Sequence, residues 1–407
     1  MRRLEKKIKL LSVEQAQRII FKNIKPLKFK EKINIENSYK RVLRSNINSK
    51  RNQPELDLSS MDGYAVRKKD LNKIPITLKL IGEIKAGDKV SRGIQKNQAF
   101  RIYTGAPIPK GADKIIIQEN CIETEDEVSI KKENKENFIR KKSNDISNKF
   151  VLKAPKLINT RDIALMGVMN QRKIEVFRKP KIGILATGDE ITEVGEKTNK
   201  YNQPASSKPS IISLIKNWGG DPIDFGIAKD KDIELSKKIG KANKCDLFVT
   251  IGGASVGKYD LTHSSLIKMG FKLDFWKIAM QPGKPMMFGS SKNTFVIGLP
   301  GNPVSALICS EIFLKKAIYA LQGIKHEDFT INAILDNDIA PTNFRKQYLR
   351  GNLYFDKKTS EMRVKLLKNQ DSASLLPYSK SNSLIMIDPH SKKQKKGSKV
   401  RVYVLNN

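Results

Sequence analysis

One stretch of this chain, Gly298-Leu-Pro-Gly-Asn-Pro-Val-Ser305, constrains the local fold more than any other. It follows a short apolar run and opens a long apolar periodic segment. This order predicts a buried strand, a rigid loop and a helix with Asn302 at the N-cap and Pro303 at the first position. Gly301 would let the backbone approach a ligand, and the free N–H groups of the helix start would favour an oxyanion or phosphate. A rigid turn without a ligand explains this single loop equally well.

Two further loops have the same character. Ile251-Gly-Gly-Ala-Ser-Val-Gly-Lys-Tyr-Asp260 follows the apolar run 247–251, and Ala186-Thr-Gly-Asp-Glu190 follows the strand-like run 181–185. Adjacent glycines, a hydroxyl and a lysine suit a backbone nest around an anion, although the spacing is not that of a Walker A loop. Three such loops at the ends of predicted strands fit the place of ligand sites in open α/β sheets.

The period of the apolar residues changes at Pro180 and predicts a mostly parallel, doubly wound sheet. Strand-like runs alternate with helical runs, as in a series of βαβ units. The strands are expected at 181–187, 222–228, 246–251 and 295–298, and the helices at 209–218, 231–242, 261–269 and 303–321.

The sequence on either side of this region predicts other parts. Ser12-Val-Glu-Gln15 is typical of a capping box, and residues 160–169 predict a helix before a strand at 173–177. Short alternating runs broken by Gly and Pro indicate an inserted all-β part between these helices, and a small barrel or sandwich after residue 325. The runs lie at 74–80, 98–103, 114–118, 127–131, 347–355, 362–367, 383–388 and 400–405, and a solvated hairpin is expected over Glu123–Asn137.

We therefore expect a multidomain α/β plus β protein with four domains. They are a discontinuous helical domain at 1–55 and 146–178, an inserted β-rich domain at 56–145, a doubly wound α/β domain at 179–325 and a C-terminal β-barrel-like domain at 326–407.

The large positive charge raises the question of a nucleic-acid partner. The chain has 77 Lys and Arg against 42 Asp and Glu, a formal net charge of +35. The charge is spread along the whole chain with a general enrichment in Lys, Asn and Ile, and no nucleic-acid-binding motif accompanies it. Genome composition explains this charge better than a specific nucleic-acid partner, and the field would also favour an anionic small substrate.

The cysteine, histidine and apolar patterns exclude several classes of protein. Cys121, Cys245 and Cys309 form no CxxC motif or disulfide framework, and the three histidines stand in no zinc or triad motif. The basic start lacks the apolar stretch of a signal peptide, and no apolar run reaches the length of a membrane span. We expect a soluble protein of the reducing cytoplasm without a membrane partner.

Carboxylates and lysines gather in the predicted loops. The carboxylates are Asp62, Asp189, Glu190, Asp230 and Asp260, and the lysines are Lys258, Lys277 and Lys284. Lys277 is predicted on a strand and Lys284 in the tight loop after it, although either could be solvated surface, and Asp62-Gly63 alone is typical of a hairpin turn. No activated nucleophile is visible. The set therefore favours a metal-assisted reaction on a phosphate ester, with Mg²⁺ on carboxylates and lysines around the phosphate.

Six motifs follow one another along nearly the full length of the chain. They are Ser60-Met-Asp-Gly-Tyr-Ala65, Arg101-Ile-Tyr-Thr-Gly105, Leu185-Ala-Thr-Gly-Asp-Glu190, Gly252-Gly-Ala-Ser-Val-Gly257 with Asp260, Pro282-Gly-Lys-Pro285 and Gly298-Leu-Pro-Gly-Asn-Pro303. In this order they resemble the molybdopterin molybdenumtransferases of the bacterial MoeA type, a family related to the gephyrin E domain.

The resemblance implies an elongated homodimer of four-domain subunits, with a molybdopterin-binding α/β domain. It implies Mg²⁺-assisted insertion of molybdate into adenylylated molybdopterin with release of AMP, and transient contacts with other enzymes of molybdenum cofactor biosynthesis or with acceptor enzymes. By motif position it implies catalytic roles for Asp62, Asp145, Asp230 and Asp260, with Asp62, Asp230 and Asp260 as the metal ligands. The implied substrate-binding residues are Thr104, Thr187, Glu190, Ser207, Gly252, Gly253, Ser255, Lys277, Lys284, Pro300, Asn302 and Pro303.

Three stretches depart from the family pattern. Arg140-Lys-Lys-Ser-Asn-Asp145 retains only the Asp of a Gly-Glu-Asp, because Ser143 and Asn144 take the other two positions. Ser207 replaces an Asn at the start of a helix, and Gln370-Asp-Ser-Ala-Ser374 lacks the glycines of a Gln-Gly-Ser-Gly. These departures concern the geometry of the substrate loops and leave the α/β site intact.

Two alternative functions remain open. The related molybdopterin adenylyltransferase resembles the central domain alone, so the inserted and C-terminal β domains argue against it. A non-catalytic scaffold of the gephyrin type would not need the carboxylates, which this chain retains.

Overall fold

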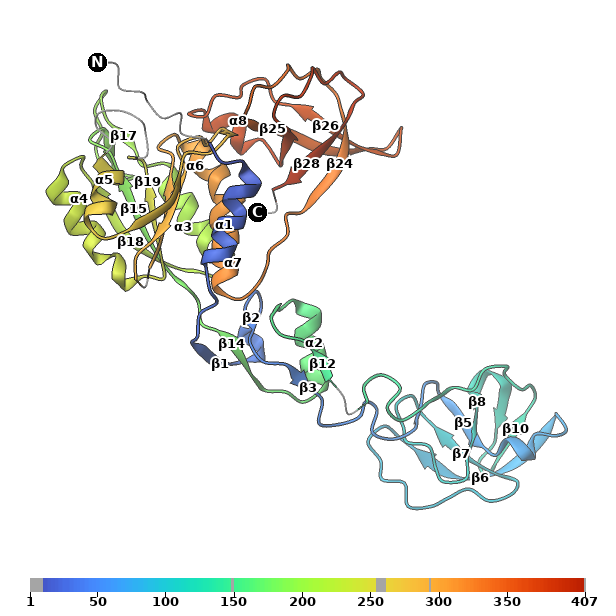
Figure 1. The fold of residues 1–407 in the computed structure, drawn as a ribbon. Helices are drawn as coiled ribbons and strands as arrows, with labels where there is room; N and C mark the ends of the chain where they lie inside the picture. The colour runs from blue at the N-terminus through green and yellow to red at the C-terminus, as the bar shows by residue number, and fades with distance from the viewer. Residues whose placement is uncertain (1–9, 148–149, 254–260, 293, 406–407) are drawn as a thin grey trace, which may run out of the picture. The chain divides into compact units, whose positions relative to one another are not determined.

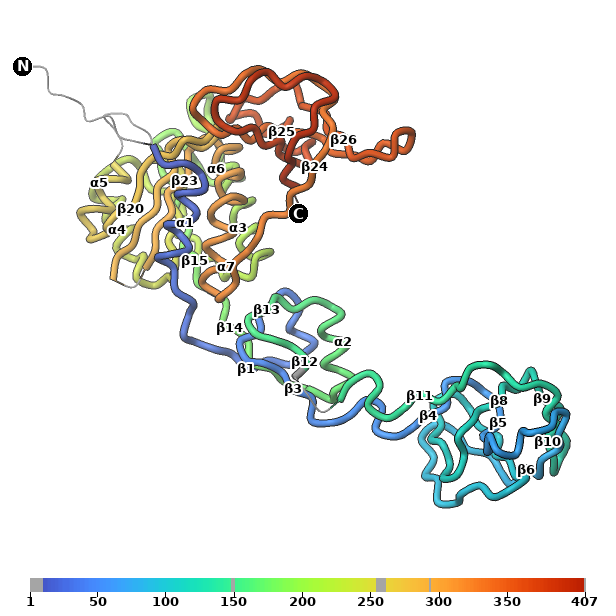
Figure 2. Tube along the Cα trace, turned by 45° about the vertical axis from the view of Figure 1, so that its right-hand side comes forward, coloured from blue at the N-terminus to red at the C-terminus, as the bar shows by residue number. Residues whose placement is uncertain are grey.

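The computed structural model describes residues 10–147, 150–253, 261–292 and 294–405. The chain divides into two compact units, the first formed by residues 1–31, 40–42 and 176–407 and the second by residues 32–39 and 43–175. Figures 1 and 2 show the elements of both units. The finer division into four domains stays a prediction. Among the described residues, no helix has both the length and the apolar character that crossing a membrane requires.

A six-stranded sheet lies at the centre of the first unit, in the order β18-β15-β19-β23-β22-β20. Its strands are β15 (Lys181–Thr187), β18 (Asp221–Ala228), β19 (Leu247–Ile251), β20 (Lys272–Trp276), β22 (Met287–Ser290) and β23 (Phe295–Leu299). Strands β18, β15, β19 and β23 are parallel, which confirms the predicted sheet. Strand β22 joins β23 in the antiparallel direction and β20 pairs antiparallel with β22, an edge that the sequence did not indicate.

Helices cover both faces of this sheet. They are α1 (Val13–Asn23), α3 (Ser207–Asn217), α4 (Asp232–Ile239), α5 (Leu261–Lys268), α6 (Pro303–Cys309) and α7 (Lys315–Leu321), with a 3₁₀ helix at Gly240–Lys244 and a π-helical turn at Ser310–Leu314 between α6 and α7. Helices α4 and α5 lie on one side of the sheet and α1, α3 and α7 on the other (Figure 1). The sheet is therefore doubly wound, as predicted.

Strand alternation explains how the sheet fills two cores. Ile184 of β15 and Val249 of β19 belong to the apolar cluster that includes α1, α3 and the α6–α7 helix. Their neighbours in the same strands, Leu185 and Phe248, belong to the cluster under α4 and α5. Successive side chains of a strand point to opposite faces, so each strand contributes to both cores. The predicted capping box of α1 is confirmed, since the side chains of Ser12 and Gln15 each accept a hydrogen bond from the other's backbone N–H.

Five strands of the first unit close into a small barrel. They are β24 (Thr330–Leu335), β25 (Lys346–Asp356), β26 (Glu361–Leu366), β27 (Ser383–Ile387) and β28 (Lys399–Val404). Their order is β25-β26-β24-β28-β27, and β27 pairs back to β25. The barrel alternative of the prediction is thus confirmed, with β24 and the short helix α8 (Leu375–Ser379) in addition to the predicted strands. The short strand β21 (Met280–Gln281) pairs in parallel with β25.

The second unit is built mainly of short strands, as its alternating sequence predicts. A six-stranded sheet has the order β8-β5-β7-β6-β10-β9. Its strands are β5 (Gly63–Val66), β6 (Ile76–Ile84), β7 (Gln98–Ile102), β8 (Lys114–Ile117), β9 (Cys121–Glu123) and β10 (Glu127–Ile130). Strands β9 and β10 pair as an antiparallel hairpin that ends at Ile130, well before the predicted limit at Asn137.

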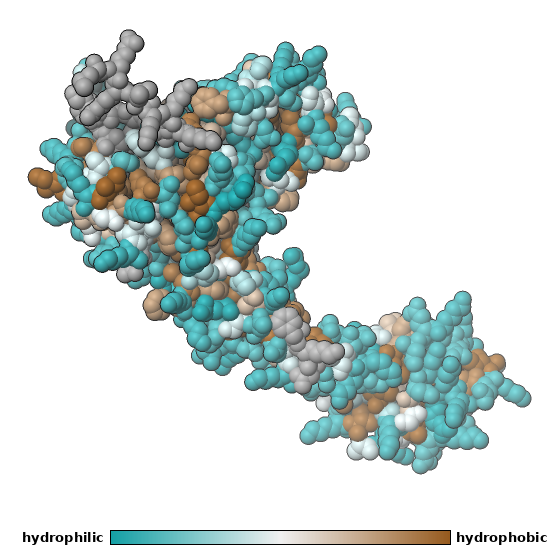
Figure 3. Space-filling view, in the orientation of Figure 1, coloured by the Kyte–Doolittle hydropathy of each residue, from teal (hydrophilic) through white to brown (hydrophobic). Residues whose placement is uncertain are grey.

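Smaller elements complete the described chain. A four-stranded sheet has the order β1-β14-β2-β13. Its strands are β1 (Lys30–Asn34), β2 (Val42–Leu43), β13 (Lys156–Leu157) and β14 (Lys173–Phe177), and the two-stranded pairs are β3 (Ile47–Asn48) with β12 (Phe150–Leu152), β4 (Leu58–Ser59) with β11 (Ile139–Arg140), and β16 (Ile191–Thr192) with β17 (Gln203–Pro204). Helix α2 (Thr160–Val168) forms where it was predicted, and short 3₁₀ helices lie at Ile35–Asn37, Lys68–Asp70 and Gln118–Asn120. Hydrophilic residues cover most of the surface seen in Figure 3.

Candidate active site

Three loops meet at the carboxyl ends of the neighbouring strands β15, β19 and β23. The N–H of Gly252 donates to the carbonyl oxygen of Leu299 at 3.1 Å, which ties the second loop to the third. The first and second loops are equally close, because a Cβ added at Gly252 would lie 2.5 Å from the carbonyl oxygen of Thr187. Gly253 has a φ of +60°, and a Cβ there would lie 1.8 Å from the hydroxyl oxygen of Thr262. The strand ends therefore converge as the sequence pattern predicts, and both glycines are required for that approach.

A pocket of about 1020 Å³ opens where these loops end. It is built wholly from the first unit. Among the predicted site residues, Thr187, Glu190, Ser207, Asp230, Gly252, Gly253, Lys284, Pro300, Asn302 and Pro303 line it. The structure thus brings most of the predicted α/β residues together around one cavity.

The C-terminal barrel supplies one wall of this pocket. The barrel residues that line it are Arg345, Tyr348, Leu349, Gln370, Asp371, Ser372, Ala373 and Leu375. The loop from Gln281 to Pro285 also lines the pocket, and it follows β21, which pairs with β25 of the barrel. The stretch Gln370–Ser374, which lacks the glycines of the family pattern, therefore contributes to the pocket wall.

The start of α6 is less open to an anion than the sequence predicts. Asn302 is the N-cap residue and Pro303 is at the helix start, as predicted, but the Asn302 side chain makes no capping bond. Its Nδ2 donates instead to Ser372 Oγ at 2.8 Å, and the N–H of Val304 donates to the carbonyl oxygen of Ser372 at 3.1 Å. A barrel loop thus occupies a donor that was expected to be free. A side chain at Gly301 would meet no steric clash within the protein, because an added Cβ would lie 3.5 Å from Gly252 Cα, an ordinary van der Waals distance.

The two predicted lysines differ in position. Lys284 lies in a turn at the pocket, as predicted. The strand position predicted for Lys277 is wrong, because this residue follows the end of β20 with a left-handed φ of 73°. Lys277 is not among the residues that line the pocket, and its role in substrate binding stays a prediction. Its Nζ lies 3.9 Å from the centre of the Trp276 ring. A lysine carries no sequence signal for a left-handed backbone, so the strand pattern was extended one residue too far. Lys258 lies outside the described residues.

A concentration of negative charge lies on one side of the pocket. The N–H of Asp230 donates to Asp189 Oδ1 at 3.1 Å, and Lys229 Nζ holds the same loop through the carbonyl oxygens of Asp189 and Ile191. Burial raises the pKa of Asp230 above its ordinary value, and the carboxylates of Asp189 and Glu190 raise this pKa further. A bound cation, or a proton shared between the carboxylates, would reduce the repulsion among these negative charges.

Three of the predicted site residues belong to the second unit. Asp62 is exposed and accepts hydrogen bonds from the Thr104 backbone N–H at 2.7 Å and from its hydroxyl at 2.8 Å. These bonds hold the pKa of Asp62 below its ordinary value, so the group is a fixed carboxylate. Asp145 is also exposed, and its backbone N–H donates to Gln53 at 3.0 Å, close to Ser143, which has a left-handed φ of 62°. Ser255 and Asp260 lie outside the described residues.

Arg350 is a charged residue beside the pocket that the sequence analysis missed. It lies on β25 and is completely buried. Its Nη2 donates to the carbonyl oxygen of Asn369 at 3.0 Å, and its Nε has no hydrogen-bond partner in the described part of the chain. The Gln370 side chain accepts from the Arg350 N–H and donates to its carbonyl oxygen, so the strand and the pocket loop are held together. The alternation of β25 was the available signal, because Arg350 shares with Tyr348 the strand face opposite to Leu349, which packs against the barrel core.

Lys208 was missed for a different reason. It is buried at the pocket beside Ser207, in the first turn of α3. Its Nζ lies 2.6 Å from a carboxylate oxygen of Glu193 and 3.0 Å from one of Asp224. Since both carboxylates come from other segments, no local spacing indicates the contact.

Three family models together match nearly the whole chain. Residues 11–169 match the model of the MoeA N-terminal region (domains I and II), residues 183–320 that of a probable molybdopterin binding domain, and residues 332–405 that of the MoeA C-terminal region (domain IV). The molybdopterin molybdenumtransferase of Haemophilus influenzae is 30% identical over 406 residues, covering 98% of this chain and 99% of that protein. That of Staphylococcus epidermidis is 30% identical over 403 residues, covering 96% of this chain and 95% of that protein.

Solved structures agree with these relatives. The molybdopterin biosynthesis MoeA protein of Pyrococcus horikoshii superposes with a TM-score of 0.82 at 27% identity, over 98% of this chain and 100% of that one. Fold, pocket and relatives define an enzyme of molybdenum cofactor biosynthesis. The chain belongs to the MoeA family of molybdopterin molybdenumtransferases.

Proposed function

We propose that this chain inserts molybdenum from molybdate into adenylylated molybdopterin and releases AMP. The observation that supports this most is the pocket of about 1020 Å³, in which three strand-end loops of the α/β domain face a wall of the barrel. Its volume is at the upper end of the range for a drug-sized ligand, which suits a pterin joined to a nucleotide. Lys284 at its lining and the buried Arg350 beside it supply positive charge.

The chemistry of the substrates fits these groups. Molybdate is a dianion at neutral pH, so Lys284 and backbone N–H groups bind it by charge and hydrogen bonds. Water cleaves the phosphoanhydride between the pterin phosphate and AMP. The two dithiolene sulfurs bind molybdenum as one oxygen of molybdate leaves as water with the two thiol protons, so the oxidation state of molybdenum does not change. The cleavage places negative charge on both phosphates, and the residues at the strand ends hold them in place while the charge develops.

The carboxylates of the pocket fit a bound Mg²⁺ ion in part. No group of three or more His, Cys, Asp and Glu residues able to hold a metal occurs among the described residues. Mg²⁺, however, usually binds to one or two carboxylates together with phosphate oxygens of the substrate. Asp230 and Glu190 supply carboxylates at the pocket. We propose that Asp230 holds the ion together with Asp260, and that the ion neutralises phosphate charge. Asp62 is the third proposed ligand.

We also propose that the enzyme is a homodimer. Asp62 and Thr104 belong to the second unit, whereas the pocket belongs to the first. The family resemblance supports a site that Asp62 of one subunit completes for the pocket of its partner.

The proposal is tested by incubating the purified chain with adenylylated molybdopterin, Mg²⁺ and molybdate and measuring AMP. We expect release that depends on molybdate and falls by a factor of about 10² in Lys284→Ala, because the lysine contacts developing charge. Lys237→Ala, an exposed lysine of α4, is the matched control and should keep the wild-type rate. No AMP above blank from folded protein would defeat the proposal, and adenylylation of molybdopterin with ATP would favour the adenylyltransferase instead.

A further inference from the structure

The helix that follows the pocket loop is interrupted by a π-helical turn. Helix α6 ends at Cys309, α7 begins at Lys315, and Ser310–Leu314 between them is π-helical. π-Helical turns are rare in proteins as a whole, and many of those that occur lie at functional sites. The second residue of this turn, Glu311, is completely buried. A buried acid in a distorted helix requires a reason in its surroundings.

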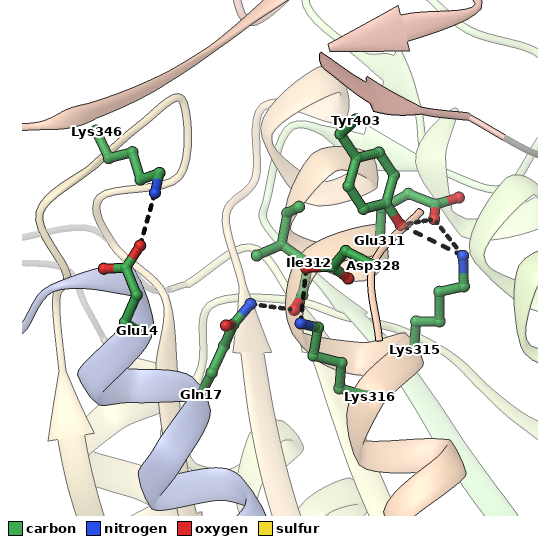
Figure 4. A network of polar contacts seen from close by, with 9 residues as sticks. All are labelled: Glu14, Gln17, Glu311, Ile312, Lys315, Lys316, Asp328, Lys346 and Tyr403. Carbon is green, nitrogen blue, oxygen red and sulfur yellow. Dashed lines mark hydrogen bonds and ion pairs between the residues drawn. The ribbon is translucent and has the colours of Figure 1, made fainter. Parts of the chain in front are cut away.

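The surroundings of Glu311 join the helix to the barrel. The hydroxyl of Tyr403, on β28, donates to Glu311 Oε2 at 3.0 Å, and Lys315 Nζ lies 3.3 Å from the same oxygen (Figure 4). Lys315 Nζ also lies 3.3 Å from the Tyr403 hydroxyl. Glu311, Lys315 and Tyr403, which we call the buried triad, therefore satisfy one another. A buried charge of this kind is costly when a partner is removed, so it favours one orientation of the elements that supply it.

A second set of contacts connects the same barrel to the pocket. Lys346, at the start of β25, pairs with Glu14 of α1 at 2.6 Å (Figure 4). It also pairs with Asp388 at 3.1 Å. Further along β25, Tyr348 lines the pocket, and Arg350 holds the loop at residues 369–374. Any shift in how the barrel is seated therefore moves one wall of the pocket.

We propose that Tyr403 and Glu311 are positioning residues, whose buried hydrogen bond seats the barrel on the α6–α7 helix and so sets the barrel wall of the substrate pocket. The inference rests on the proposed function for the identity of the substrate. Apolar packing alone, which also joins Tyr403 to Phe313 and Leu314 in one cluster, permits small slides, whereas the triad is satisfied in one arrangement.

Two tyrosine variants in the same barrel test the proposal. Tyr403→Phe removes the hydroxyl of the triad, and Tyr354→Phe is the matched control, because the Tyr354 hydroxyl donates to Asp336 at 2.9 Å on an exposed part of the barrel. In folded Tyr403→Phe we expect the KM for adenylylated molybdopterin to rise about fivefold with little change in kcat, and the amides of residues 369–374 to exchange about fivefold faster. Tyr354→Phe should match the wild type in both measurements.

A folded Tyr403→Phe protein with the KM and exchange rates of the control overturns the proposal. If that variant does not fold, Glu311→Gln and Glu311→Ala replace it. The glutamine keeps an acceptor for the Tyr403 hydroxyl, so we expect its KM to stay nearer the wild type than that of the alanine, and equal values for both contradict the proposal. Hydrogen exchange needs no substrate. A failure of the proposed function therefore appears as absent AMP release in the wild type, and a failure of positioning as unchanged exchange in the variant.

Discussion

At the scale of single residues, Asp230 combines a cost in stability with a proposed role in the reaction. Its pKa is raised above the ordinary 3.8 by burial and by Asp189 and Glu190. A raised pKa in the folded state means that ionisation destabilises the fold, and that this cost sets in as the pH rises from about 4 through the raised pKa. Active sites commonly keep such groups because the charge serves catalysis.

We predict that Asp230→Asn is more stable than the wild type at pH 7 but inactive. The melting temperature should rise by about 1–2 °C, a small gain because the side chain is only partly buried, and AMP release should fall by a factor of about 10² or more. The gain should disappear near pH 4. Asp221→Asn, an exposed position at the start of β18, controls for charge alone. A lower melting temperature in Asp230→Asn at neutral pH contradicts this account.

The residue types at the pocket were predictable from the sequence, but their exact use was not. Thr187, Gly252 and Lys284 lie where strand ends and loop composition placed them. Lys277 does not, because its left-handed backbone depends on the turn that follows β20. Arg350 was missed because its burial depends on what packs over the outer face of β25, where its neighbour Tyr348 joins the core of the α/β part, and strand alternation alone does not encode that packing.

At the scale of elements, the period of the apolar residues identified the parallel strands and the helices between them. The antiparallel edge was missed because β22 is buried on both faces and shows no alternation. The contact of Ser372 with the start of α6 was missed because it joins residues far apart in the sequence. Tertiary contacts therefore decide what the local pattern leaves open.

The segment between α7 and the barrel carries a pH-sensitive element. His326 stacks on Tyr319 at 4.7 Å, and burial, with help from Lys315 and Lys316, lowers its pKa from 6.5 to about 4, while Asp328 acts in the opposite direction. The unfolded chain therefore binds this proton first, and stability falls as the pH drops from about 6.5 to 4.

We predict that His326→Phe, which keeps a stacking ring without a titrating group, loses less stability than the wild type between pH 7 and pH 5. Urea midpoints at both pH values measure the difference. His390→Phe serves as the control, since His390 is an exposed histidine of the barrel. Identical losses in the wild type and His326→Phe would show that another group carries the dependence.

At the scale of the whole molecule, local sequence patterns predict four domains and little about their assembly, and the chain divides into two compact units. The net charge of +35 carries no such information, since it is spread along the chain. Asp62 belongs to the second unit, whereas all the residues that line the pocket belong to the first. The proposed homodimer is what would join them in one site.

We predict that Asp62→Ala and Asp260→Ala are each inactive and that mixing them restores part of the activity. A heterodimer of the two variants contains one site with neither substitution, so up to about half of the wild-type rate is expected from a purified heterodimer. Differently tagged subunits allow that species to be isolated and assayed. Absence of any rescue, or a fully active monomer, would refute the shared site.

The most direct test of the central claim, that this chain inserts molybdenum while it cleaves the adenylylated substrate, is the ratio of two products in one reaction. Purified protein would receive adenylylated molybdopterin, Mg²⁺ and molybdate, and AMP and pterin-bound molybdenum would be quantified together. The account predicts that both appear in equal amounts and that unadenylylated molybdopterin gives far less bound molybdenum at the same molybdate concentration. AMP release without bound molybdenum, or equal molybdenum binding from both pterins, would contradict it.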